Sequence, residues 1–345
     1  MEDKIDIKSL TLSELTQFLE DMGQKKFRAK QLYSWMHEHL IEDFDQATNL
    51  PKSLIEELKE KCRLTALVVR QEQISKIDDT RKYLFELYDR NMIESVLMRY
   101  HHGNSVCISS QVGCRMGCKF CASTLDGCVR NLTASEMLDQ IYRIQKMTGE
   151  RVDNVVIMGS GEPMDNYDNV IRFIKLLNSE EGLNISQRNI TVSTCGLVEK
   201  IKELADEKLQ ITLAISLHAP NDKLRASMMP IANKYSIDEI MEAVRYYIDV
   251  TTRRVSFEYS LVDGVNDSDD CVKQLAKLLT GLNCHINLIP VNPVRERQFV
   301  RPDMKKVYSF KNKLEKYGLN VTIRREMGSD IDGACGQLRK KYMDE

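Results

Sequence analysis

The strongest constraint on this chain is a group of three cysteines between residues 114 and 121. Cys114, Cys118 and Cys121 follow the spacing C-x3-C-x2-C, with the aromatic Phe120 directly before the last cysteine. Structural zinc sites need four Cys or His ligands, usually as two separated pairs, whereas here three thiols stand close together with no fourth ligand nearby. A cage for one zinc ion would therefore be incomplete. Two alternatives remain for these cysteines: a zinc knuckle, or small buried side chains that bind no metal.

Three thiolates suit an iron–sulfur centre better. A 4Fe-4S cluster with only three protein thiolates keeps one iron open to an outside ligand. The spacing resembles the signature of the radical S-adenosylmethionine (SAM) enzymes, in which the open iron binds the amino and carboxylate groups of SAM. The resemblance implies that Cys114, Cys118 and Cys121 hold the cluster.

Length and composition indicate a globular protein of the cytoplasm. At 345 residues the chain can form one large domain and a smaller one, and its 42% hydrophobic and 29% charged residues are ordinary for a soluble protein. No apolar stretch is long enough to cross a membrane, and the acidic start lacks the apolar segment of a signal peptide. We therefore expect a cytosolic location and no membrane partner. We also expect a monomer, an expectation that composition does not establish.

The remaining cysteines divide by context. In a reducing cytosol, cysteines more often indicate metal binding, catalysis or inert burial than disulfides. Cys62, Cys195, Cys271 and Cys284 lie in apolar, helix-like or strand-like segments, and we expect them to be buried and inert. The role of Cys128 stays open.

Net charge gives no global case for nucleic-acid binding. The chain carries a formal charge of -2, whereas phosphate contacts need concentrated Lys and Arg. Two segments are locally basic: residues 301–345 hold eleven Lys and Arg against seven Asp and Glu, and residues 24–31 read QKKFRAKQ. Either segment can also be an ordinary solvated face.

The chain divides into four parts. Residues 1–62 carry apolar residues at helical spacing and predict a small helical module, which residues 63–100 follow as a β-rich connector. Residues 101–326 alternate between strand and helix patterns, and residues 327–345 form a C-terminal tail. Apolar strands that alternate with amphipathic helices indicate a parallel sheet with helices outside it. We therefore predict an α/β fold containing a partial (β/α)6-type barrel.

The predicted elements of the barrel follow one another closely. Strands are expected at 105–110, 152–159, 188–194, 210–218, 254–262, 285–291 and 320–326, and helices at 133–148, 167–180, 197–207, 236–250, 268–280 and 303–317.

Polar and glycine-rich motifs follow five of these strands. They are the cysteine group, residues 159–163, residues 193–196, residues 216–218 and residues 290–293. In a barrel of this kind the loops at the carboxyl ends of the strands carry the chemistry, and a small ligand bound across them needs contacts from several strands. Glu162 suits an ammonium group, and Ser193, Ser216 and Asn292 can hydrogen-bond a carboxylate, ribose or adenine. His218 can do the same or support the strand end.

Two more cysteines stand out. Cys107 lies seven residues before the cysteine group, and Cys335 lies in the polar, glycine-flanked segment DIDGACGQL. The first and last strands of a barrel can approach the same rim, so these two thiols can meet at one site. A thiol in such a tail is poorly placed to pack in a core, and reactivity explains it better.

At this point the sequence resembles the RlmN/Cfr family of radical-SAM RNA methyltransferases. The resemblance covers nearly the whole chain, through FRAKQLYSWM, the cysteine group, RNLT, GSGEPMDN, SLHAP, the DGVND stretch and DIDGACGQL. It implies Cys335 as the methyl-carrying cysteine, Cys107 as the resolving cysteine, Glu94 as a proposed base, and Gly161, Glu162, Ser193, Ser216, Leu217, His218 and Asn292 as SAM contacts. Glu94 can equally be a carboxylate on a strand surface.

The mechanism implied by the resemblance uses two SAM molecules per turnover. A ring carbon of adenine is not nucleophilic, so it does not take the methyl group of SAM by displacement. Cys335 takes a methyl group from one SAM, and a second SAM, reduced at the cluster, yields a 5'-deoxyadenosyl radical that removes hydrogen from it. The methylene radical adds to adenine, and Cys107 then releases the product by forming a disulfide with Cys335. An electron donor such as flavodoxin or ferredoxin is implied.

The resemblance also implies the substrate. The sequence Gly161-Glu162-Pro163 is similar to the branch that methylates carbon 2 of an adenosine in large-subunit (23S) ribosomal RNA and in tRNA next to the anticodon. Under this interpretation the N-terminal module holds folded RNA through Lys25, Lys26, Arg28 and Lys30, unless it is a purely structural cap. The alternatives are a carbon-8 methyltransferase of the antibiotic-resistance branch, a non-catalytic RNA-binding protein with a structural metal cluster, and a radical-SAM enzyme for a small molecule.

Overall fold

The N-terminal part of the structure is a small helical module. The structure, a computed structural model, describes residues 4–292, 298–333 and 336–344. The module consists of the short strand β1 (Ile5–Asp6), helices α1 (Leu12–Asp21), α2 (Phe27–His37) and α3 (Lys52–Lys61), and the short strand β2 (Cys62–Arg63). Thr11 and Glu14 form a capping box that starts α1, and Pro51 precedes α3. Leu15 and Leu19 of α1 are fully buried, which confirms the helical spacing.

In the described part of the chain, ten strands form one sheet in the order β14-β13-β12-β11-β10-β9-β6-β5-β4-β3. The strands are β3 Val68–Ile74, β4 Arg81–Glu86, β5 Met92–Tyr100, β6 Gly103–Cys107, β9 Asn154–Ile157, β10 Ile190–Thr194, β11 Thr212–Ser216, β12 Val255–Leu261, β13 Cys284–Pro290 and β14 Val321–Ile323. From β6 to β14 neighbouring strands pair in parallel, and from β3 to β6 they pair antiparallel. The predicted parallel-dominated α/β architecture is confirmed.

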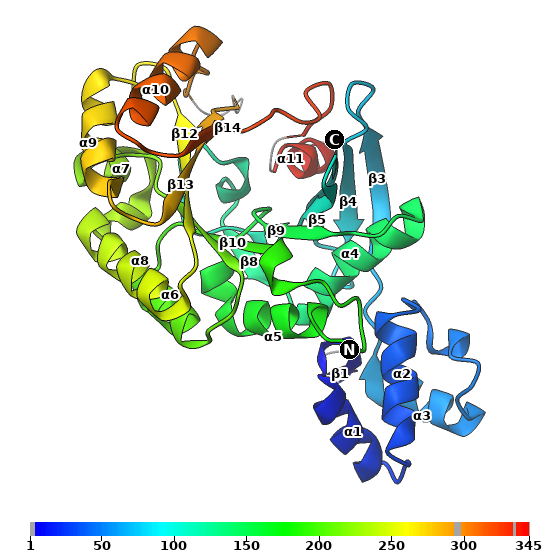
Figure 1. The fold of residues 1–345 in the computed structure, drawn as a ribbon. Coiled ribbons are helices and arrows are strands. Elements are labelled where there is room, and N and C mark those ends of the chain that lie inside the picture. The colour runs from blue at the N-terminus through cyan, green and yellow to red at the C-terminus, as the bar shows by residue number, and fades with distance from the viewer. Residues whose placement is uncertain (1–3, 293–297, 334–335, 345) are drawn as a thin grey trace.

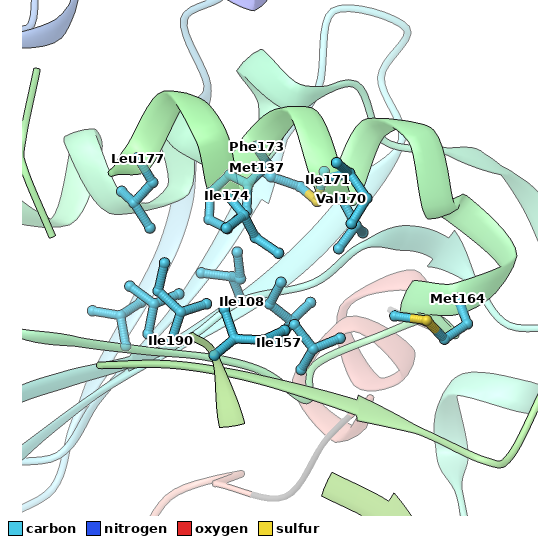
Figure 2. Close-up of a cluster of buried hydrophobic side chains, with 14 of the residues drawn as sticks. Ile108, Met137, Ile157, Met164, Val170, Ile171, Phe173, Ile174, Leu177 and Ile190 are labelled. Carbon is cyan, nitrogen blue, oxygen red and sulfur yellow. The ribbon is translucent and has the colours of Figure 1, made fainter. Parts of the chain in front are cut away.

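Helices follow the parallel strands, as the sequence pattern predicts. They are α4 Ala134–Thr148, α5 Tyr167–Leu177, α6 Val198–Asp206, α8 Ile237–Thr251, α9 Asp269–Leu279 and α10 Met304–Lys316. The core lies between these helices and the sheet: Figure 2 shows Phe173 and Ile174 of α5 above Ile108, Ile157 and Ile190. Removal of this apolar surface from water holds the helices against the strands.

Some elements were not predicted from the sequence. The short strands β7 (Gln111–Gly113) and β8 (Cys128–Asn131) pair antiparallel at the two ends of the segment that carries the cysteine group. Two short helices, α7 (Asp222–Met228) and α11 (Gln337–Asp344), were also not predicted. Each is too short to show a clear periodic pattern. The strands of the predicted connector, β3 to β5, continue the main sheet rather than forming a sheet of their own.

The segment after β14 crosses back to the opposite half of the sheet. Asp330 accepts hydrogen bonds from the Ser75 hydroxyl (2.5 Å) and the Lys76 backbone N–H (2.8 Å), and the Asp332 N–H donates to Gln73 Oε1 at 3.0 Å. Figure 1 shows α11, in red, beside β5. The C-terminal tail therefore lies next to the antiparallel strands, although β14 forms the far edge of the sheet.

A buried ion pair fixes the helical module to the barrel. Lys8 Nζ lies 2.8 Å from Asp139 Oδ1 of α4, and both side chains are almost fully buried. The second Asp139 oxygen accepts the Leu67 N–H at 2.7 Å, and His37 Nδ1 lies 2.8 Å from the Tyr142 hydroxyl. These contacts join α2 and the start of the chain to α4. No helix in the described ranges has both the length and the apolar character needed to cross a membrane.

Candidate functional site

The predicted site residues meet in one cavity of about 340 Å³ at the carboxyl ends of the parallel strands. This size is within the range of small-molecule sites. The cavity is lined by Glu94, Cys107, Cys114, Cys118, Cys121, Gly161, Glu162, Ser193, Ser216, His218 and Asn292. The side chain of Leu217 is buried behind this surface, and Cys335 lies outside the described residues. Gly333, two residues before Cys335, also lines the cavity.

The cysteine group forms a tight loop after the β7 strand. Gly113 has a φ of +76°, and a Cβ there would lie 2.0 Å from the Gly127 carbonyl oxygen, so glycine is required. The Cys114 N–H donates to that same carbonyl at 2.8 Å. Burial raises the pKa of the Cys114 thiol to about 12 and also raises the pKa of Cys118. Binding of a metal centre must therefore displace protons from these thiols.

The donor set fits a cluster better than a single ion. Within the described ranges, no three Cys, His, Asp or Glu side chains converge closely enough to bind one metal ion. Three thiols around one cavity suit a 4Fe-4S cluster, because each thiolate then binds a different iron atom. Cys114, Cys118 and Cys121 are the residues that would hold it.

Glu162 presents a buried carboxyl group to the cavity. Its two oxygens accept backbone N–H bonds from Met164 at 3.0 Å and Cys195 at 2.8 Å, and burial raises its pKa. Gly161, with a φ of +109°, brings this turn against Gln111, where a Cβ would lie 2.7 Å from the Gln111 backbone nitrogen. Close packing of the turn therefore places the carboxyl group at the cavity wall.

Ser193, Ser216 and His218 lie at the ends of β10 and β11. The two serine hydroxyls are 3.3 Å apart. His218 has a φ of +57°, and its Nδ1 accepts the Ser260 N–H at 2.9 Å. Burial lowers the pKa of His218 to about 3, so the neutral ring carries its proton on Nε2. His218 is thus a fixed hydrogen-bond donor as well as a support for the strand end.

Asn266 is a site residue to which sequence reasoning gave no role. It is fully buried, and its amide donates to the carbonyls of His218 and Ser260 at 2.7 Å each, while its Oδ1 accepts the Val262 N–H at 2.8 Å. It therefore fixes the backbone of His218. The DGVND stretch contained this residue, but its partner is 48 positions away.

Glu94 is buried at the cavity rather than on a strand surface. It is 5% exposed, and Lys82 Nζ lies 3.0 Å from its Oε2. The same oxygen accepts the Gly336 N–H at 2.7 Å, and Oε1 accepts the Arg339 N–H at 2.5 Å. The carboxylate thus binds the N-terminal end of α11, where the helix dipole favours negative charge.

Two other groups line the cavity. Cys107 is half-buried, and burial raises its pKa. Glu258 of β12, which sequence reasoning missed, accepts a hydrogen bond from Asn287 Nδ2 at 2.8 Å, and burial raises its pKa. A carboxylate inside the apolar strand pattern RVSFEYSLV was the available signal.

The other cysteines behave as their context predicts. Cys62, Cys195, Cys271 and Cys284 are buried as expected, while Cys128 is half-buried; that the four buried thiols are inert stays a prediction. Cys195 also contributes to the cavity wall.

Comparison with known proteins places this geometry in a family. Residues 108–279 match the model of the radical SAM superfamily, and residues 5–64 match the ribosomal RNA large subunit methyltransferase N-terminal domain. A protein of Lachnospira eligens described as probable dual-specificity RNA methyltransferase RlmN is 70% identical over 99% of this chain and 97% of its own length. The chain belongs to the RlmN family of radical SAM proteins.

Two further comparisons support the family fold. An RlmN relative from Lachnoclostridium phytofermentans is 60% identical over 99% of this chain and 96% of its own length. The crystal structure of a radical SAM methyltransferase from Sphaerobacter thermophilus is 45% identical and matches with a TM-score of 0.93, covering 96% of this chain and 98% of the other. The predicted family and the radical-SAM fold are therefore confirmed. Membership of the RlmN family implies a 4Fe-4S cluster and SAM.

Proposed function

We propose that this protein is a radical-SAM methyltransferase that methylates carbon 2 of an adenosine in large-subunit ribosomal RNA and in tRNA. One observation carries the proposal: the cysteine group, Cys107, Glu94 and the polar strand-end residues line one cavity. The printed names of the relatives, dual-specificity RNA methyltransferases, support RNA as the substrate. The resemblance of Gly161-Glu162-Pro163 to the carbon-2 branch of the family favours carbon 2 over carbon 8.

The cluster and SAM, when bound, supply a methyl group and radical hydrogen abstraction. The chain's own residues bind and orient these groups. We assign cluster binding to Cys114, Cys118 and Cys121. Glu162 receives an ammonium group, because each of its oxygens keeps acceptor capacity beyond the single backbone N–H it already binds.

SAM recognition continues along the neighbouring strand ends. The hydroxyls of Ser193 and Ser216, the Nε2–H of His218 and the amide of Asn292 provide hydrogen bonds for a carboxylate, a ribose or an adenine. Gly161 and Leu217 shape the backbone beside them.

Cys335 and Cys107 act on the methyl group and the product. Cys335 carries the methyl-derived carbon to adenine, and the Cys107 thiolate then attacks the Cys335 sulfur and forms a disulfide. The sulfur–carbon bond breaks, its electron pair stays with the product carbon, and that carbon takes up a proton to complete the methyl group. External thiols must reduce that disulfide before the next turnover. This route consumes two SAM molecules. Glu94 lies close enough to the cavity to accept the ring proton, and its contacts with α11 add a positioning role.

The deciding experiment follows methyl deuterium. Protein reconstituted with iron and sulfide without oxygen receives SAM with a deuterated methyl group, a reductant and unmodified large-subunit RNA, and nucleosides are analysed by mass spectrometry. We expect 2-methyladenosine that has lost one of the methyl deuteriums, made by the parent protein and by the control Cys271→Ala, but not by Cys335→Ala.

Other outcomes would locate the error. Methylation at carbon 8 would refute the assigned ring position. Formation of 5'-deoxyadenosine without a modified nucleoside would refute the RNA substrate, and absence of 5'-deoxyadenosine would favour the non-catalytic RNA-binding alternative.

Several attributes stay predictions from the sequence. They are the cytosolic location, the monomeric state, the electron donor of flavodoxin or ferredoxin type, the division of the chain at residues 62, 100 and 326, and phosphate binding by Lys25, Lys26, Arg28 and Lys30. Of these basic residues, Arg28 is half-buried and the three lysines are exposed, which leaves the lysines accessible to RNA.

A further inference from the structure

Arg225 of α7 is a fully buried arginine behind the cysteine loop. It is 0% exposed and is among the largest fully buried side chains in the described part of the chain. Its Nη2 donates to the carbonyl oxygens of Cys195 (2.5 Å) and Ser216 (3.4 Å), and its Nε donates to Leu217 O at 3.2 Å. Its Nη1 finds no hydrogen-bond partner in the described part of the protein. The guanidinium therefore fixes the turns at Cys195 and at residues 216–217, and its Nη1 donor group remains without a hydrogen bond among the described residues.

The charge of Arg225 is not balanced by a carboxylate. A guanidinium stays protonated in proteins, and a buried charge is costly unless an opposite charge lies beside it. Among the described residues, no Asp or Glu is within 4.0 Å of it, in contrast to Lys8 and Lys82, which each pair with a buried carboxylate. All of its hydrogen bonds go to neutral backbone carbonyls. The guanidinium therefore has no direct anionic partner, although the Asp222 carboxylate attracts it from a greater distance.

The cysteine loop lies next to this cation. Cys118 and Cys195 pack in a small apolar cluster with Met228 and Met229, which follow Arg225 in the chain. The Lys119 N–H donates to Met228 O at 2.9 Å, which fixes the loop to the end of α7. Burial lowers the pKa of Arg225, and Cys195, Cys118 and Asp222 act in the opposite direction. Arg225 does not line the cavity, so it does not meet SAM or a base directly.

We propose that Arg225 is the buried counter-ion of the iron–sulfur cluster and sets its reduction potential. Thiolates that hold a cluster are negatively charged, whereas free thiols are not. Reduction adds a further electron, so a fixed cation in a low-dielectric interior stabilises the reduced form more than the oxidised form. This inference rests on the cluster in the proposed function and is independent of the RNA substrate.

The test is a redox titration followed by electron paramagnetic resonance, without SAM or RNA. We compare the reconstituted parent protein with Arg225→Met, which removes the charge, Arg225→Lys, which keeps it, and Arg245→Met, which removes an exposed charge from α8. At a fixed applied potential, we expect Arg225→Met to lower the ratio of reduced to oxidised cluster about tenfold, equivalent to a 59 mV shift for one electron. Arg225→Lys and Arg245→Met should stay close to the parent.

Salt separates a buried charge from a surface effect. The shift caused by Arg225→Met should persist at high ionic strength, because a buried charge is weakly screened. If Arg225→Met folds poorly, as judged by circular dichroism, Arg225→Gln removes the charge and keeps a donor for the carbonyls.

Two results would overturn the proposal. The first is an unchanged potential in a cluster-loaded neutral variant. The second is an equal shift in Arg225→Lys and Arg225→Met. That result would mean that the hydrogen bonds of the planar guanidinium to the backbone carbonyls, and not its charge, determine the potential. A parent protein that binds no cluster would refute the cofactor assignment as well, whereas a failure to methylate RNA would leave the titration result intact.

Discussion

At the residue scale, His37 shows how burial makes folding depend on pH. It is fully buried against Tyr142, and burial lowers its pKa to about 3, from a usual value near 6.5. Below pH 6.5, His37 therefore binds a proton in the unfolded chain but stays neutral in the folded chain until the pH approaches 3. The contribution of His37 to the free energy of unfolding is complete above pH 6.5 and is lost as the pH falls toward 3.

We therefore predict a difference between the parent and His37→Gln, which keeps a partner for Tyr142 and does not titrate. Between pH 7.0 and 5.5, the free energy of unfolding should fall by about 1.2 kcal/mol more in the parent than in the variant. Glu162 and Glu258, with raised pKa values, act in the opposite direction in both proteins and cancel in the comparison. Urea unfolding at the two pH values measures this difference, and replacement of an exposed histidine, His39→Gln, is the control. An equal fall in the free energy of unfolding in the parent and in His37→Gln would contradict the prediction.

Site residues were predictable where they form local motifs. The three cysteines and Glu162 stand at strand ends in segments whose spacing or composition shows their chemistry, and the structure brings them to one cavity. Sequence patterns gave no role to Arg225 and Asn266, because some of their hydrogen-bond partners are distant in the sequence and are brought close only by folding. A buried arginine in a short helix has no local sequence signal that distinguishes it from an exposed one.

At the element scale, the periodic strands and helices of the barrel were predicted to within a few residues, whereas sheet order was not. Strand β14 is the last strand of the barrel, as expected, whereas the return of the following tail to β3 and β5 was not predicted. Hydrophobic alternation identifies a strand but carries no information about its neighbours. The segment DIDGACGQL therefore indicated a reactive thiol without indicating that Glu94 binds the helix after it.

The attachment of α11 to Glu94 gives the second prediction. Glu94→Gln keeps the size of the side chain but removes the charge that binds Lys82 and the N–H groups of Gly336 and Arg339. Hydrogen bonds to charged groups contribute about 1.5–3 kcal/mol, so the amides at the start of α11 should exchange hydrogen at least about tenfold faster. Hydrogen exchange with mass spectrometry measures this, and Glu86→Gln on the neighbouring strand β4 is the control.

The same variant separates two roles of Glu94. Gly336 follows Cys335 in the sequence, so a released helix should reduce RNA methylation through the position of that segment. Unchanged exchange in α11 together with lost methylation would instead assign Glu94 to proton transfer alone. Faster exchange with full methylation would remove it from the reaction.

At the scale of the whole molecule, a buried ion pair that could not be predicted from the sequence connects the helical module to the barrel. Lys8 and Asp139 are 131 positions apart, and neither lies in a motif that indicates the other. Figure 1 shows the module, in blue, attached near α4 and α5. Because both charges are buried, removal of one leaves the other uncompensated, at a cost of about 3–5 kcal/mol.

Trp35, the single tryptophan of the chain, reports on the module alone, whereas far-ultraviolet circular dichroism reports on the whole fold. In urea, we expect the two signals to change together in the parent protein, because the ion pair couples the module to α4. In Lys8→Met the tryptophan signal should change at a lower urea concentration than the dichroism. Replacement of an exposed lysine of α3, Lys52→Met, should behave as the parent.

The double variant Lys8→Met with Asp139→Leu also removes the carboxylate that Lys8→Met leaves unpaired. It should bring the two transitions closer together, since no unpaired charge remains buried. Coincident transitions in Lys8→Met would mean that the apolar contacts between module and barrel, rather than this ion pair, make the molecule unfold as one unit.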